Sequence, residues 1–155
     1  MNQRDDLGSK TPGDWLSVVR TGQSWGFPAC FGQGGEPCTG VPQPTAVLDR
    51  HAAVSGVAIT TGDLGPAVGT SALVAEWAVG KVQRVVLTSA GDTWTGTTVP
   101  FLTGIKNPVP LLLSPSGSLS GMPSPSGSLS GMPSPSGTLL VGDWATGTVY
   151  AVSQS

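Results

Sequence analysis

Two stretches of the sequence match each other without gaps: Leu73-Val-Ala-Glu-Trp-Ala-Val-Gly-Lys-Val-Gln-Arg-Val85 and Leu140-Val-Gly-Asp-Trp-Ala-Thr-Gly-Thr-Val-Tyr-Ala-Val152. Each begins with an apolar run that ends in an acidic residue and Trp. A Gly three residues after the Trp permits a tight turn into a second run, which carries Val at two matching positions. The pattern predicts a strand–turn–strand hairpin that is used twice, at an offset of 67 residues.

A second repeat interrupts the later copy. Ser114-Pro-Ser-Gly-Ser-Leu-Ser-Gly-Met-Pro123 is followed unchanged by residues 124–133, and residues 134–137 begin a third unit. Removing residues 114–133 would leave an uninterrupted hairpin and an offset of 47, close to the length of a propeller blade. The decapeptides carry too little apolar surface to offset their ordering entropy, so we expect a dispensable, flexible excursion from a hairpin tip. A β-solenoid of decapeptides is the alternative, although two and a half units fall short of the three that stacking needs.

Short runs rich in β-branched residues recur between Gly and Thr turns from residue 45 onward, whereas the first fifty residues contain turn signals without a sustained period. The second to fifth runs make one four-stranded blade, and the last three make most of another. The expected fold is therefore all-β: a partial β-propeller of about one complete blade plus three strands of a second, with a long N-terminal loop region. The predicted strands are Thr45–Leu48, Gly56–Thr60, Leu73–Trp77, Val82–Thr88, Thr97–Leu102, Val109–Leu113, Thr138–Trp144 and Gly147–Val152.

This organisation divides the chain into four parts. Residues 1–50 are the loop-rich segment, 51–113 the first blade and the start of the second, 114–137 the Ser/Gly/Pro-rich insert, and 138–155 the end of the second blade. Such a partial ring leaves blade faces and strand edges exposed. We therefore expect self-association, or missing propeller blades as partners.

The composition excludes two classes of protein. Seven Lys and Arg against nine Asp and Glu give a net charge of −2, which argues against binding to nucleic acid. No apolar run is long enough for a membrane span, and residues 1–10 lack the apolar core of a signal peptide. A mean hydropathy of +0.12 is too high for a wholly disordered chain.

Cys30 and Cys38 are the two cysteines of the chain and flank a Gly-rich stretch that could fold back on itself. A local disulfide is the favoured interpretation and would indicate an oxidising compartment. Two free thiols in a cytosolic protein are the alternative. A zinc site is disfavoured because it needs about four ligands and the chain adds one histidine, His51.

Four motifs that occur in order resemble the C-terminal part of the glucose/sorbosone dehydrogenases. They are Gly13-Asp-Trp-Leu16, Trp25-Gly-Phe-Pro28, Pro100-Phe-Leu-Thr-Gly-Ile-Lys-Asn-Pro-Val109 and Leu139-Leu-Val-Gly-Asp-Trp-Ala-Thr-Gly-Thr-Val-Tyr150. The resemblance covers nearly the whole chain apart from the decapeptide insert. It implies a six-bladed β-propeller that oxidises sugars with pyrroloquinoline quinone (PQQ), at an extracellular or periplasmic location.

The resemblance also suggests two site residues. His51 matches a histidine that the family often carries at this later position, so it is a candidate cofactor-binding residue; a loop or packing histidine is the alternative. Asp14 matches the Asp of a loop that resembles a calcium-binding element, with Asp5 and Asp6 near it in sequence. Asp14 is thus a candidate metal ligand, with a solvated turn aspartate as the alternative.

Two departures from the family pattern argue against autonomous catalysis. The family's catalytic base lies in early blades that have no counterpart here, so no residue is assigned as catalytic. The arginine-bearing motif is replaced by residues 75–80, with no arginine before Arg84. Trp77 and Trp144 hold equivalent repeat positions, which favours blade packing over a role as sugar platforms.

The expected function follows from these observations. The chain resembles the C-terminal blades of a quinone-dependent sugar dehydrogenase without catalysis of its own, and its status as an enzyme stays open. PQQ and calcium are suggested by the family but are not expected to bind well to this chain alone. A sugar- or protein-binding β module, or a structural protein that assembles through exposed strand edges, are the alternatives.

Overall fold

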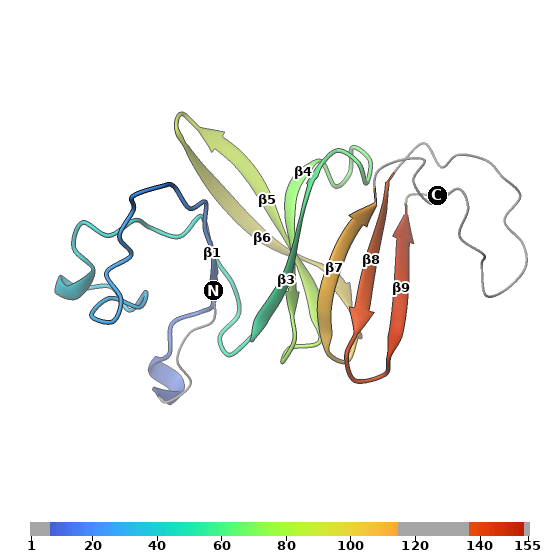
Figure 1. The fold of residues 1–155 in the computed structure, drawn as a ribbon, viewed down its shortest axis with the longest axis horizontal. Helices are drawn as coiled ribbons and strands as arrows, with labels where there is room; N and C mark the ends of the chain where they lie inside the picture. The colour runs from blue at the N-terminus through green and yellow to red at the C-terminus, as the bar shows by residue number, and fades with distance from the viewer. Residues whose placement is uncertain (1–6, 115–136, 154–155) are drawn as a thin grey trace, which may run out of the picture.

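The computed structural model describes residues 7–114 and 137–153 and is all-β within them (Figure 1). The strands form three antiparallel sheets: a two-stranded sheet β1-β2, a four-stranded sheet β3-β4-β5-β6 and a three-stranded sheet β7-β8-β9. The elements in chain order are η1 (Gly8–Lys10), β1 (Trp15–Leu16), η2 (Glu36–Cys38), β2 (Ala46–Val47), β3 (Val54–Thr61), β4 (Thr70–Glu76), β5 (Lys81–Ala90), β6 (Thr93–Thr103), β7 (Pro108–Ser114), β8 (Thr138–Asp143) and β9 (Thr148–Ser153).

All eight predicted strands are present, and the grouping into four and three strands is confirmed. The strand order in each sheet follows the chain, because each strand is joined to the next by a short hairpin or by the connection that carries the insert. The sequence analysis missed β1, whose two residues are too few to produce a periodic signal. The decapeptides at 115–136 lie outside the described residues. Ser114 and Thr138, at their two ends, are paired across β7 and β8.

The two repeat copies form equivalent hairpins. Gly80 and Gly147 adopt left-handed φ values of 73° and 67°, which glycine tolerates without steric cost. Their amides donate to the carbonyls of Glu76 and Asp143 at 3.0 and 2.9 Å and close the two turns in the same way. The gap-free sequence match therefore corresponds to one turn geometry used twice.

The first strands of the two sheets carry matching irregularities. The register shifts between Val54 and Val57 in β3 and between Pro108 and Leu111 in β7. These positions are 54 residues apart, whereas Glu76 and Asp143 are 67 apart, so the β7–β8 connection is 13 residues longer than the β3–β4 connection. The expected 47-residue offset is wrong, because the connection after β3 is itself longer than a minimal hairpin turn.

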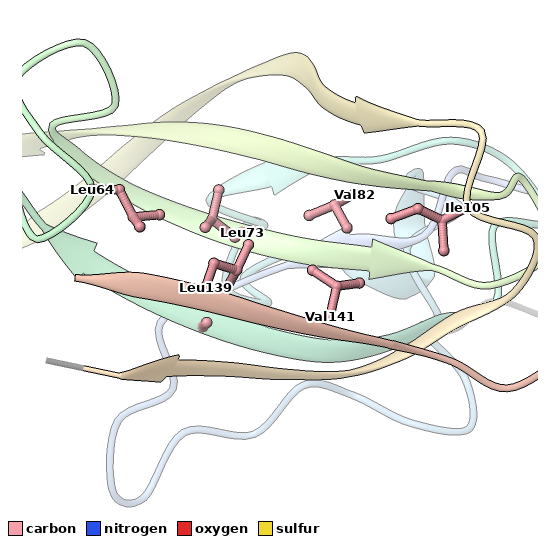
Figure 2. Close-up of a cluster of buried hydrophobic side chains, with 7 residues drawn as sticks. Leu64, Leu73, Val82, Ile105, Leu139 and Val141 are labelled. Carbon is pink, nitrogen blue, oxygen red and sulfur yellow. The ribbon is translucent and has the colours of Figure 1, made fainter. Parts of the chain in front are cut away.

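A core of buried aliphatic side chains joins the four-stranded and three-stranded sheets. Figure 2 shows Leu73 of β4 and Leu139 of β8 pointing toward each other across this interface. Ser55 Oγ adds a hydrogen bond of 3.1 Å from β3 to the Pro108 carbonyl of β7. The buried members of this core are Ala58, Leu64, Leu73, Val82, Ile105, Leu139 and Val141.

The N-terminal segment covers the opposite face of the four-stranded sheet (Figure 1). Ala46 and Leu48, in and beside β2, pack against Ala72, Val74 and Val85. The Gly96 amide of β6 also donates to the Thr45 carbonyl at 2.9 Å. The first fifty residues were expected to be a long loop, and part of them forms a second hydrophobic layer.

Candidate functional site

The disulfide loop forms an aromatic pocket of about 90 Å³. Cys30 and Cys38 are bonded to each other, which confirms the predicted pairing. The rings of Trp15 and Trp25 stack with centroids 4.9 Å apart and planes inclined by 20°. Phe27, Phe31, Pro42, Gln43 and Pro44 complete most of the wall together with the disulfide.

Local hydrogen bonds hold this loop in place. The Gln33 side chain accepts from the Phe31 amide at 2.7 Å and donates to the Ala29 carbonyl at 2.8 Å. The Cys30 amide donates to the Gly26 carbonyl at 2.9 Å. The loop therefore depends on its own polar contacts and the disulfide rather than on a neighbouring sheet.

The predicted metal ligand Asp14 is buried, so the expectation of a solvated turn aspartate is wrong. Its Oδ2 accepts a hydrogen bond of 3.2 Å from the Val54 amide at the start of β3. Its backbone carbonyl accepts from the Leu48 amide at 2.7 Å. Asp5 and Asp6, the suggested co-ligands, lie outside the described residues. Within residues 7–114 and 137–153, no three His, Cys, Asp or Glu side chains gather where they could hold a metal ion.

The predicted cofactor residue His51 lies in the turn just before β3. It is exposed and has a left-handed φ of 53°, and it does not line the aromatic pocket. Arg84, the first arginine after the altered family motif, donates from Nε to Ser71 Oγ at 3.0 Å and from Nη2 to the Val68 carbonyl at 2.6 Å. The structure therefore does not bring His51, Asp14 and Arg84 together in this pocket.

Asp143 fastens the entry to the three-stranded sheet. Its buried carboxylate accepts hydrogen bonds from the amides of Lys106, Asn107 and Ala145 at 3.0–3.2 Å. Burial raises the pKa of Asp143, but the three amides outweigh it and the net pKa is lowered. Asp14 stands in the same Gly-Asp-Trp triplet and also binds an amide next to an incoming strand.

Glu76, the repeat equivalent of Asp143, belongs to an ionic cluster. Lys81 Nζ lies 3.2 Å from the fully buried Glu76 Oε2 and 2.7 Å from Asp49 Oδ2. Burial raises the pKa of Glu76, with Asp49 adding to it, and Lys81 opposes this only in part. Burial lowers the pKa of Lys81, but the two carboxylates dominate and the net pKa is raised. This cluster is suited to holding the β4–β5 turn rather than to acid–base chemistry in the pocket.

The expectation that Trp77 and Trp144 pack within the blades is wrong. They are 40% and 76% exposed. Each is the first residue of its hairpin turn rather than the last of a strand. Their amides donate to equivalent carbonyls, those of Ala53 and Asn107, at 3.3 and 2.9 Å. The repeat therefore preserves the backbone corner, and both rings face solvent in this chain.

The aromatic pocket is the feature that the sequence analysis missed. Trp25-Gly-Phe-Pro28 was used as a family motif, and the aromatic density around the two cysteines was the available signal. Trp15 and Trp25 meet only because the intervening chain reverses direction, which no periodic pattern records. A disulfide loop with several aromatic residues is thus a more useful predictor of a pocket than either feature alone.

Comparison with family models, curated proteins and solved structures found no match for this chain. None of the helices in the described ranges has the length and apolar character to cross a membrane.

Proposed function

We propose that this chain supplies two consecutive blades of a β-propeller of the glucose/sorbosone dehydrogenase type, completed by further blades, and that it has no catalysis of its own. The disulfide is consistent with the extracellular or periplasmic location that the resemblance implies. The proposal rests on the way in which repeat-related faces of the two sheets are buried or exposed.

One face of the four-stranded sheet is buried against the three-stranded sheet. Ala58, Leu73 and Val82 line this face and belong to the shared core. Their equivalents in the next sheet, by the offsets given above, are Leu112, Leu140 and Val149. We call these three residues the outer face of the three-stranded sheet.

The outer face is apolar and solvent-exposed in the chain by itself. Leu112 is 62% exposed and Val149 66%, and Leu140 is half-buried. Exposed apolar groups that stand where their repeat equivalents are buried indicate a missing neighbour. Head-to-tail packing of this kind continues in the same sense from blade to blade, so the expected occupant is a further β-sheet.

The described residues do not fit the family's cofactors. The Asp14 carboxylate already binds the Val54 amide, and the Arg84 guanidinium binds Ser71 and Val68. Neither group is therefore available to calcium or to an anionic quinone without breaking the fold. This supports a role as part of a larger propeller rather than as a separate oxidoreductase.

The double variant Leu112→Lys/Val149→Lys tests the outer face. We expect the unchanged chain to self-associate with rising concentration and to bind the dye ANS, because an uncovered apolar face does both. The double variant should stay monomeric and bind several-fold less dye, as measured by sedimentation and fluorescence. The control is Val18→Lys/Val19→Lys, which charges exposed side chains of the N-terminal segment. If both variants behave like the unchanged chain, the outer face is not a packing surface.

A dye-reduction assay tests the absence of autonomous catalysis. With glucose and other aldoses, added PQQ and calcium, we expect no turnover above a blank without protein, because no described residues enclose a cofactor and a substrate together. Turnover that is abolished by His51→Ala would contradict the proposal and make His51 a catalytic residue.

The alternative function, a sugar- or protein-binding β module, is favoured by one specific observation, the aromatic pocket beside the disulfide. A pocket that is independent of the blade faces can serve binding in an isolated chain or in a completed propeller.

A further inference from the structure

We propose that the aromatic pocket binds an extended peptide segment through a proline residue. The proline ring would occupy the pocket, and a backbone carbonyl of the peptide would accept a hydrogen bond from Trp25 Nε1. This inference does not depend on the proposed propeller, because the pocket is built from the disulfide loop and its surroundings.

The size of the pocket selects a small group. Its volume of about 90 Å³ is smaller than the roughly 150 Å³ of an engineered apolar cavity that binds benzene. A single five-membered ring or a branched aliphatic side chain therefore fits, and a larger fused ring does not. The walls of Trp, Phe and Pro offer the flat apolar surfaces on which proline rings pack in proline-recognising grooves.

The polarity of the pocket selects a neutral ligand with an acceptor. No side chain of Asp, Glu, Lys, Arg or His is among the described residues that line it. Trp25 Nε1 is buried and has no hydrogen-bond partner among the described residues. A buried N–H group without a partner carries a desolvation cost that a peptide carbonyl would remove.

These features favour proline over three other ligands. A quaternary ammonium group would suit aromatic walls but provides no acceptor for Trp25. A purely aliphatic group has the same deficiency. A sugar would have to satisfy several hydroxyl groups, and Gln43 is the one lining side chain with an amide group.

The loop is organised before any ligand arrives. The Cys30–Cys38 bond, the Trp15–Trp25 stack and the two Gln33 hydrogen bonds restrain the walls. A polyproline II peptide is also largely fixed in conformation, so binding would order few additional groups. Low ordering cost on both sides allows a small pocket to give measurable affinity.

The test uses a peptide whose sequence occurs in this chain. Gly-Met-Pro-Ser-Pro-Ser stands at residues 121–126 and again at 131–136, and it serves here as a capped synthetic probe. The full oxidised chain is titrated with it while the five tryptophan indole N–H signals are followed by NMR. We expect a saturable shift of the Trp25 indole signal, which is assigned by its loss in Trp25→Phe.

Two variants and one altered peptide test the geometry. Trp25→Phe keeps a ring but removes the donor, and we expect about a five-fold weaker affinity. Phe27→Ala removes a lining ring that is 74% exposed and therefore unlikely to support the fold; we expect about a ten-fold loss. Trp94→Phe, which alters an exposed ring outside the pocket, should leave affinity unchanged. The peptide with both prolines replaced by Ala should not saturate.

Three outcomes would overturn the proposal. The first is the absence of a saturable shift with the proline peptide in a chain with an intact disulfide. The second is equal affinity for the alanine peptide, which would show that proline is not recognised. The third is a saturable shift of the same indole signal with tetramethylammonium or glucose and none with peptide, which would assign the pocket to a cation or a sugar.

Discussion

Leu73→Ala is expected to lower the free energy of unfolding by about 3 kcal/mol. Leu73 has no exposed surface and lies in the core between the two larger sheets, beside Leu139 (Figure 2). Truncation removes buried methyl groups and leaves a cavity that a sheet-to-sheet interface cannot easily close. Urea unfolding followed by circular dichroism measures the change. For a small domain this is a large part of its total stability.

Leu140→Ala is the matched control, since Leu140 is the repeat equivalent of Leu73 and differs from it chiefly in burial. We expect a loss of about 1 kcal/mol or less, because the side chain is already partly hydrated. Equal losses for the two variants would contradict the assignment of Leu73 to the buried face and Leu140 to the outer face. If a further blade covers the outer face, the Leu140→Ala cost should rise toward that of Leu73→Ala in the assembled protein.

The strands could be predicted from the sequence because each is short, rich in β-branched residues and bounded by Gly or Thr turns. The gap-free repeat also predicted the common geometry of the hairpins that end at Gly80 and Gly147. The burial of Trp77 and Trp144 could not be predicted in this way. A repeat records that two positions are equivalent, but burial depends on whether a neighbouring layer is present, and that differs between the ends of a stack.

The candidate site was predictable only in part for a related reason. Two cysteines with glycines between them indicated the disulfide directly. The stack of Trp15 on Trp25 depends on a chain reversal that has no periodic signature. The role of Asp14 was misjudged because the amide it binds belongs to Val54, 40 residues away in sequence. Turn composition predicts local exposure, and it carries no information on such long-range partners.

Lys81→Met is expected to lower the free energy of unfolding by about 3 kcal/mol near neutral pH. Lys81 is the ionic partner of Glu76, which has no exposed surface, and also of Asp49. Its removal leaves a buried carboxylate without a compensating charge and brings it under the influence of Asp49 alone. Methionine keeps most of the aliphatic stem, so the loss is electrostatic rather than a cavity effect. Chemical unfolding in urea measures it without added salt effects.

The double variant Lys81→Met/Glu76→Gln separates this cause from a packing defect. Neutralising Glu76 removes the unpaired charge, so we expect the double variant to recover most of the lost stability. If it stays as unstable as Lys81→Met, the defect comes from packing and the ionic explanation is wrong.

The pH dependence of Lys81→Met provides an independent check. The pKa of Glu76 is already raised by burial in the unchanged chain, and without Lys81 it rises further. A carboxyl group with a raised folded-state pKa favours the folded state below its unfolded pKa and loses that contribution as pH rises through the folded pKa. The deficit of Lys81→Met relative to the unchanged chain should therefore shrink as pH is lowered from about 8 to about 5, because Glu76 takes up a proton. A deficit that stays constant over this range would mean that Glu76 is not the group left uncompensated.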